Sequence, residues 1–283
     1  LLNFGSTCIG EIAVSAESAA KALDQIGLRA VVSELVYDVD LLKLRDGVYE
    51  YSSDRGDRTL KEAVRIVDMF SDGNRIKGAF GPLAPDMCTR DLLKKLVEIA
   101  QERNRLIKMH VAQSQVEMQQ VNRMHNMRPV EYLHELGILS PRFIATHCVH
   151  VNNDEIRLLG QTKTNIAHCP WMIATRGMSA PLLQFLDERI NVGMGTDNFF
   201  GDMLDCMRLA ALVARIRTNQ GSRPTPAELL EIATIRGAKA LGMEREIGSI
   251  EVGKKADIIV VGVKKLHLAP DLNMISNLVH YGN

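Results

Sequence analysis

The chain has 283 residues, 46% of them hydrophobic, so it can bury a sizeable core in one α/β barrel or in two smaller domains. Its formal net charge is zero, which provides no basic field for nucleic acid or anionic lipid. No apolar run approaches the length that spans a bilayer. We therefore expect neither nucleic acid nor a membrane as a partner.

Strand-like and helix-like segments alternate along the chain. Seven apolar segments are typical of buried strands, at 7–10, 30–37, 76–80, 106–110, 143–147, 165–168 and 190–197. Helical spacing or helix-start residues predict helices at 15–26, 59–70, 89–103, 130–136, from Asn152 or Asn153 onward, 181–188, 203–218 and 226–241. The stretch 38–58 is charged and irregular, and it is long enough to be a functional loop.

Strands separated by helices indicate βαβ units and a parallel sheet. A closed barrel needs eight strands and we count seven, so the sheet is either open or lacks one strand. The opening Leu-Leu-Asn-Phe-Gly reads like the tail of a helix that joins a strand, and the expected missing element is the first strand.

The tail differs in kind from the rest of the chain. Residues 247–261 predict short strands bounded by glycines, with no helix between them, and a further strand-like piece precedes Tyr281. The chain also looks cut short at its C-terminus. We therefore divide it into a barrel at 1–243 and part of a small β-sandwich at 244–283.

Polar side chains end four of the predicted strands. His110, His147 and His168 close three of them, and Asp197 closes a fourth. Only eight histidines occur in the chain, so three at the same place in the strand pattern are informative. Active sites of parallel barrels are built at the carboxyl ends of the strands. Imidazole and carboxylate together suit zinc, which makes hydrolysis by a metal-activated water the leading hypothesis.

Several residues close to these strand ends are candidates for binding. Cys169 directly follows His168, but adjacent strand residues point to opposite faces, so both cannot easily reach one metal. Trp171 could stack on a planar ring, or it could pack against the rim of a barrel. Asn198, Phe199 and Phe200 follow Asp197 and could line a pocket.

The five cysteines are odd in number and have no CxxC spacing. This pattern is typical of reduced core residues, and it leads us to expect a cytoplasmic protein.

The strand-end motifs resemble those of the amidohydrolase superfamily. The resemblance is strongest to the branch that holds cytosine-, guanine- and adenosine-type deaminases and triazine hydrolases, and it runs from about residue 5 to the end. The motifs that carry it are His110-Val-Ala-Gln-Ser114, Thr146-His-Cys-Val-His150, Ala167-His-Cys-Pro170, Gly195-Thr-Asp197 and the tail segment 248–257.

The resemblance implies a TIM (β/α)8 barrel with a composite β-sandwich made from both chain ends. It also implies one divalent metal ion, for which zinc is expected and iron is the alternative. By motif position, His110 and Asp197 match metal ligands on the fifth and eighth strands. His147 matches the sixth-strand histidine that faces the reacting centre, and Asp197 would also take the proton of the attacking water.

The sequence departs from this family in two ways. The paired histidines of the first strand are absent, and that is the strand missing from our count. Gln113 stands where deaminases of this branch usually carry a glutamate that shuttles a proton to a ring nitrogen. A carboxamide can hydrogen-bond a substrate but cannot transfer a proton at neutral pH.

The expected function is metal-dependent hydrolysis of a C–N or C–Cl bond in a small nitrogen heterocycle such as a purine, pyrimidine, pterin or triazine. Gln113, His168, Trp171 and Asn198 are the expected substrate-binding residues, and His147 and Asp197 the catalytic ones. Two alternatives are hydrolysis of an acyclic amide or carbamoyl group, and a non-catalytic barrel that binds a small molecule. A homo-oligomer is compatible with all three hypotheses.

Overall fold

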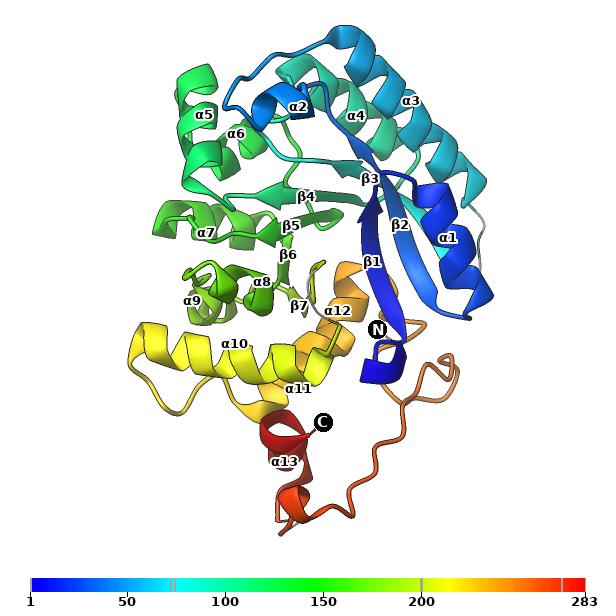
Figure 1. The fold of residues 1–283 in the computed structure, drawn as a ribbon, viewed down its shortest axis with the longest axis vertical. Coiled ribbons are helices and arrows are strands. Elements are labelled where there is room, and N and C mark those ends of the chain that lie inside the picture. The colour runs from blue at the N-terminus through cyan, green and yellow to red at the C-terminus, as the bar shows by residue number, and fades with distance from the viewer. Residues whose placement is uncertain (1, 72, 74, 199–200, 271, 283) are drawn as a thin grey trace. The chain divides into compact units, whose positions relative to one another are not determined.

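The computed structural model describes residues 2–71, 73, 75–198, 201–270 and 272–282 (Figure 1). Its contacts divide the chain into two compact units. The N-terminal unit comprises Cys8–Thr146 and His150–Thr164. The C-terminal unit comprises Leu1–Thr7, His147–Val149 and Asn165–Asn283. Seven strands follow one another in chain order in the sheet. The predicted number of strands and the predicted α/β alternation are therefore confirmed.

The N-terminal unit alternates strands with helices. Its pairs β1–β2, β2–β3 and β3–β4 are parallel. Its elements are β1 (Cys8–Ala13), α1 (Ala16–Gln25), β2 (Arg29–Val36), α2 (Leu41–Leu44), α3 (Ser53–Met69), β3 (Ile76–Pro82), α4 (Arg90–Glu102), β4 (Ile107–Val111), α5 (Gln115–His125), α6 (Pro129–Glu135), β5 (Phe143–His147, whose last residue belongs to the other unit) and α7 (Asn153–Gln161).

The core of this unit forms between its strands and the helices that cover them. One buried cluster joins β2 and β3 to α1 and α3, through Ala16, Ala20, Ala30, Val32, Ile66 and Ile76. Burying such aliphatic side chains stabilises the unit by about 1.5–3 kcal/mol for each valine or isoleucine. Gly78 allows α3 to approach the sheet closely, because a Cβ atom there would lie 2.7 Å from Cα of Val67.

The buried side chain of Lys108 links strands of this unit. The Nζ of Lys108, on β4, donates hydrogen bonds of 2.7 Å to the backbone carbonyls of Glu11 and Val31. Burial lowers the pKa of Lys108 to about 7. The amino group therefore joins β4 to two strands that precede it in the sheet.

The C-terminal unit begins with the short helix η1 (Leu2–Phe4) and contains the parallel pair β6–β7. The long helix α10 of this unit is followed by its C-cap Asn219, which adopts a left-handed conformation. Its other elements are β6 (Asn165–His168), α8 (Pro170–Thr175), α9 (Leu182–Asp187), β7 (Val192–Met194), α10 (Met203–Thr218), α11 (Pro226–Ala233), α12 (Ile235–Ala240), η2 (Leu266–Leu268) and α13 (Met274–Tyr281).

Three predicted segments differ from the structure. The stretch 38–58, expected to be irregular, contains α2 and the first turns of α3, because Asp40 and Ser52 cap these helices. The helix predicted at 226–241 is interrupted at Thr234, whose backbone (φ −124°, ψ −98°) is not helical. The strand-like piece before Tyr281 is the helix α13, which Asn273 caps.

The tail also lacks the strands predicted for 247–261, since the structure assigns neither helix nor strand to any of these residues. Ile258 and Val260 have exposed side chains. A strand needs a hydrogen-bonded neighbour, and none lies beside this segment within the described part of the chain. The division at 243/244 therefore stays a prediction.

None of the helices in the described residues combines the length and apolarity that a membrane crossing requires. All five cysteines are free thiols.

Candidate metal and catalytic site

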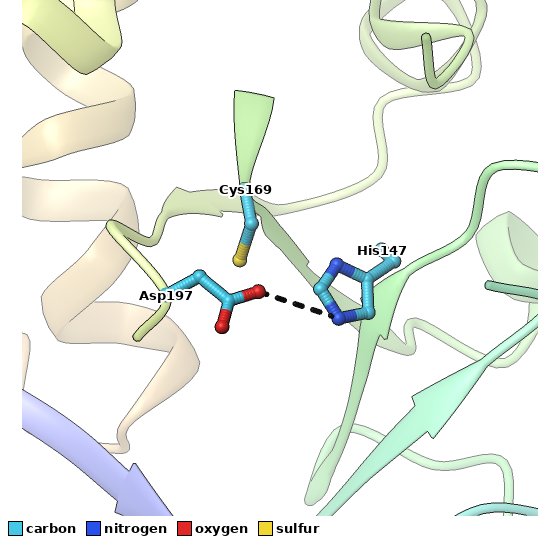
Figure 2. Close-up of side chains that lie close together, drawn as sticks. All are labelled: His147, Cys169 and Asp197. Carbon is cyan, nitrogen blue, oxygen red and sulfur yellow. Dashed lines mark ion pairs between the residues drawn. The ribbon is translucent and has the colours of Figure 1, made fainter. Parts of the chain in front are cut away.

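Three ligand-type side chains converge in the C-terminal unit (Figure 2). They are His147 at the end of β5, Cys169 just after β6 and Asp197 just after β7. One nitrogen of His147, the Sγ of Cys169 and one carboxylate oxygen of Asp197 all lie within 4.8 Å of one another. Nε2 of His147 is 3.7 Å from Oδ2 of Asp197. The two residues predicted to be catalytic therefore lie together.

The local backbone turns sharply at these strand ends. His147 has φ +76°, Cys148 +49° and Asp197 +60°, which are left-handed values that non-glycine residues seldom adopt. Such backbone costs about 1–3 kcal/mol per residue and is typical of functional sites. Here it turns the side chains of His147 and Asp197 toward each other at the point where their strands end.

The Asp197 carboxylate is held in a defined orientation. Its Oδ1 accepts a 2.7 Å hydrogen bond from the backbone N–H of Asn198, while Oδ2 faces His147. The side chain of Asp197 is only 17% exposed, and that of His147 is 1% exposed. The carboxylate therefore acts on its surroundings in a medium that screens charge much less than water does.

Cys169 occupies its place because Gly195 leaves room for it. A Cβ atom on residue 195 would lie 2.7 Å from Sγ of Cys169. Burial, together with the charge of Asp197, raises the pKa of the Cys169 thiol well above its usual range. In the absence of a cation the group is therefore a neutral thiol.

His168 does not join this cluster. It is buried, and its Nδ1 has no hydrogen-bond partner among the described residues. Burial lowers the pKa of His168 to about 4, so the imidazole is neutral at physiological pH. The sequence argument that only one of His168 and Cys169 can reach a given point agrees with this geometry. The residue that meets His147 and Asp197 is Cys169.

The remaining predicted residues of this unit lie near the cluster in sequence. Trp171 is half-buried on α8, and Asn198 is exposed. Phe199 and Phe200 lie outside the described residues.

His110 and Gln113 belong to the N-terminal unit. Nδ1 of His110 lies 2.7 Å from the carbonyl oxygen of Leu83, and because a carbonyl only accepts, Nδ1 carries the hydrogen. The lone pair is then on Nε2. This tautomer and this type of support are common among metal-binding histidines.

Glu117 holds the backbone that carries Gln113, a role the sequence reading missed. The Glu117 carboxylate accepts hydrogen bonds from the backbone N–H groups of Ala112 (2.6 Å) and Gln113 (2.8 Å). Ala112 has a left-handed φ of +50°, so the chain turns there under strain. The sequence signal for this role was the capping-box pattern Ser114-Gln-Val-Glu117, in which Ser114 is the N-cap of α5. Here the Glu117 side chain accepts hydrogen bonds from the two residues just before that N-cap.

A buried carboxyl group lies near this turn. Asp86 accepts a 2.6 Å hydrogen bond from the hydroxyl of Tyr49, and its backbone carbonyl accepts one from Tyr51. The charge of Asp86 also contributes to the raised pKa of Glu117. The end of β4 is therefore surrounded by polar groups that burial makes costly to ionise.

The fold is an α/β fold, and three ligand-type side chains lie together at the ends of its strands. The chain matches the Amidohydrolase family over residues 1–282, and it belongs to that family.

Several of the proteins that it resembles are deaminases. It is 32% identical to the 5'-deoxyadenosine deaminase of Methanobrevibacter smithii, over 99% of this chain and 64% of that protein. It is 33% identical to the 5-methylthioadenosine/S-adenosylhomocysteine deaminase of Thermoanaerobacter pseudethanolicus, over 98% of this chain and 63% of that protein. The crystal structure of an adenosine deaminase from Xanthomonas campestris with bound zinc superposes with a TM-score of 0.89 at 28% identity, covering 98% of this chain and 62% of that one.

These comparisons confirm the predicted family, its deaminase branch and the barrel fold class. The chain spans somewhat less than two thirds of the length of the relatives it matches.

Proposed function

We propose that this protein is part of a metal-dependent deaminase that hydrolyses the amino group from a purine of the adenosine type. The observation that carries the proposal is the pairing of His147 and Asp197, 3.7 Å apart, in a chain about one third identical to deaminases of such nucleosides. The reaction replaces the amino group on the ring carbon with oxygen from water and releases ammonia.

The residues of the site fit a divalent metal ion by their chemistry. Nitrogen, sulfur and carboxylate oxygen are the donor types that zinc takes in proteins, and zinc is bound in the Xanthomonas campestris relative. We propose zinc as the ion, with iron as the alternative, and His110 and Asp197 as ligands. When bound, the ion supplies a Lewis acid that lowers the pKa of water from about 16 to about 7.

The side chains of this protein move the protons. In the proposal, Asp197 accepts the proton of the attacking water. His147, buried beside it, hydrogen-bonds the reacting carbon's substituents, and the proton that Asp197 takes from the water passes to the leaving amine, through His147 or directly from Asp197. Gln113 orients the polar edge of the ring, since its carboxamide both donates and accepts hydrogen bonds but carries no transferable proton.

His168, Trp171 and Asn198 complete the proposed substrate pocket. A neutral His168 can hydrogen-bond a ring nitrogen, and the indole of Trp171 can stack on a planar base. Asn198 is exposed and adjoins Asp197, so its carboxamide can bind the sugar or another polar substituent.

The proposal also covers organisation and location. Residues 1–243 would form the barrel and 244–283 part of a composite β-sandwich. A cytoplasmic location suits five free thiols. A homo-oligomer is also compatible with the proposal.

The test is a substrate screen with zinc-loaded protein. Adenosine, 5'-deoxyadenosine, S-adenosylhomocysteine, guanine and a chlorotriazine are each incubated with the protein, and ammonia or chloride release is measured. We expect ammonia from one or more adenosine-type substrates. Chloride release alone would favour a dehalogenating hydrolase. A zinc-loaded, folded protein that releases neither would contradict the proposal.

A further inference from the structure

We propose that Arg128 is a positioning residue for the proposed reaction, and that it fixes Gln113 by holding the backbone of His150. The inference rests on the proposed function, in which Gln113 orients the substrate. Its evidence is a continuous series of hydrogen bonds that runs from the buried carboxylate of Glu155 to the backbone beside Gln113. Every residue of this series belongs to the N-terminal unit.

The carboxylate of Glu155, on α7, anchors the series. Its side chain is fully buried, and it accepts hydrogen bonds from Nε of Arg128 (2.7 Å) and from the backbone N–H groups of Asn152 (3.0 Å) and Val130 (3.2 Å). Hydrogen bonds to a charged group are about twice as strong as those between neutral groups. The carboxylate therefore fixes the guanidinium of Arg128, the N-cap residue of α6, against the start of α7.

The guanidinium of Arg128 also holds the chain that follows β5. Its Nη2 donates a 2.5 Å hydrogen bond to the backbone carbonyl of His150. Because a guanidinium presents its N–H donors in a rigid planar fork, one side chain can bind Glu155 and this carbonyl in a fixed relation. The ammonium of a lysine ends a flexible stem and cannot hold two acceptors in the same geometry.

Two hydrogen bonds join His150 to the chain that follows β4. Its backbone N–H donates to the carbonyl of Ala112 (2.9 Å), the residue before Gln113. Nε2 of Gln115 lies 3.1 Å from Nδ1 of His150, and because an amide nitrogen only donates, Nδ1 is the acceptor. Burial and the charge of Arg128 lower the pKa of His150, so its imidazole is neutral at physiological pH and keeps the lone pair that this bond needs.

Gln113 is therefore held from two sides. Glu117 binds the backbone N–H groups of Ala112 and Gln113. His150 binds the carbonyl of Ala112. The left-handed backbone of Ala112 is unfavourable for a residue with a Cβ atom, so it depends on these bonds. A displacement of His150 thus changes the direction in which the chain carries the carboxamide of Gln113.

A double-mutant cycle tests the inference. The value of kcat/KM is measured, on the substrate found in the screen, for Arg128→Lys, Gln113→Ala and the double variant. We expect Arg128→Lys alone to lower kcat/KM about tenfold, because a misplaced binding group costs this much or more. When residue 113 is already alanine, the same substitution should have at most a roughly twofold effect. A general loosening of the fold would lower kcat/KM equally in both backgrounds.

Arg90→Lys is the matched control. The side chain of Arg90 is 38% exposed, compared with 36% for Arg128, and it also pairs with a glutamate. Its partner Glu135 lies at the last residue of α6, whereas Arg128 precedes the first. We expect Arg90→Lys to keep the kcat/KM of the natural protein. Circular dichroism and the unfolding temperature establish that each variant is folded.

Hydrogen exchange, followed by mass spectrometry over residues 111–117, tests the same link without a substrate. The amides of Ala112 and Gln113 should exchange about tenfold faster in Arg128→Lys and at the natural rate in Arg90→Lys. If Arg128→Lys does not fold, Gln115→Ala takes its place in both experiments. Gln115 is exposed, and its replacement removes the side-chain bond to His150.

The outcomes separate this inference from the proposed function. An equal loss of kcat/KM in both backgrounds, or natural exchange rates in a folded Arg128→Lys, overturns the role of Arg128 and leaves the proposed function intact. Faster exchange in Arg90→Lys as well also overturns it. Faster exchange confined to Arg128→Lys, in a zinc-loaded protein that deaminates nothing, supports the link to Gln113 and removes the proposed function.

Discussion

Glu117 shows how a buried carboxyl group can organise a strand end. It is 4% exposed, and burial raises its pKa from an ordinary value of 4.5 to about 8, against the three backbone N–H groups of Gln113, Ala112 and Ser114 that lower it. Its carboxyl group fixes Ala112 in a left-handed conformation and thereby the direction of Gln113. The ionisation of Glu117 is therefore coupled to the stability of the fold.

The sign of that coupling can be predicted. Between pH 4.5 and about 8, the folded protein retains a proton on Glu117 that the unfolded chain releases. The contribution of this group to stability thus falls as the pH rises through this window. Between pH 5 and pH 8, we expect the free energy of unfolding of the natural protein to fall by up to about a few kcal/mol relative to that of Glu117→Gln. The reason for this size is that one pKa unit corresponds to about 1.4 kcal/mol.

Urea unfolding at several pH values measures this difference. Glu98→Gln, on the exposed face of α4, is the control and should show no such trend. A difference between the natural protein and Glu117→Gln that stays constant from pH 5 to pH 8 would show that Glu117 is ionised throughout.

Gln113 and His147 should differ in their importance for turnover. Because Gln113 only orients the substrate in the proposal, Gln113→Ala should reduce kcat/KM about tenfold to a hundredfold, or roughly 1.4–2.7 kcal/mol. His147→Ala should cost far more, because it removes a proton-transfer group. Steady-state kinetics on the substrate found in the screen checks the order. Complete loss of activity in Gln113→Ala, with His147→Ala nearly unaffected, would reverse the assigned roles.

At the scale of elements, the contact between β3 and α3 depends on a single glycine. A Cβ atom on Gly78 would meet Cα of Val67 at 2.7 Å and carbonyl oxygens of α3 at 3.1 and 3.2 Å. Because these are backbone atoms, the helix itself would have to move. We expect Gly78→Ala to destabilise the protein by about 1–3 kcal/mol or more.

Denaturant unfolding of a matched pair tests this prediction. Gly221→Ala is the control, because an added Cβ there meets nothing within 4 Å and its φ is not left-handed. Equal stability of the two variants would show that α3 shifts freely away from the sheet.

Elements with a strong local signal could be predicted from sequence. The strands 143–147 and 165–168 and the helix 203–218 have the predicted bounds, because apolar runs, Pro170 and Asp202 mark their ends. The break at Thr234 could not be predicted, because no Pro or Gly lies at it. The helix at 274–281 was predicted wrongly because the tail resembles a strand in composition, although Asn273 and Gly282 cap its two ends.

The candidate site was predictable in part. His147 and Asp197 follow from their positions at strand ends, where parallel strands bring polar groups to one edge. Cys169 could not be assigned from alternation alone, because the chain leaves the strand at that residue and the direction of its side chain depends on Gly195 opposite.

At the scale of the whole molecule, the chain belongs to the Amidohydrolase family, and its metal site and reaction are proposals. The paired histidines of the family's first strand are absent from its 283 residues. His110 and Asp197 are its proposed metal ligands, and His147 and Asp197 are its proposed proton-transfer groups. Whether these groups hold a catalytic ion decides between an enzyme and a barrel that only binds small molecules.

The most direct test of the central claim is the zinc content of the purified protein and of Asp197→Ala, measured by elemental analysis together with ammonia release. Asp197 is both a ligand and a proton acceptor in the proposed function, so the natural protein should bind zinc and deaminate its substrate, and Asp197→Ala should lose both while remaining folded. Asp154→Ala, at an exposed carboxylate, should lose neither. Unchanged zinc content in Asp197→Ala would contradict the account.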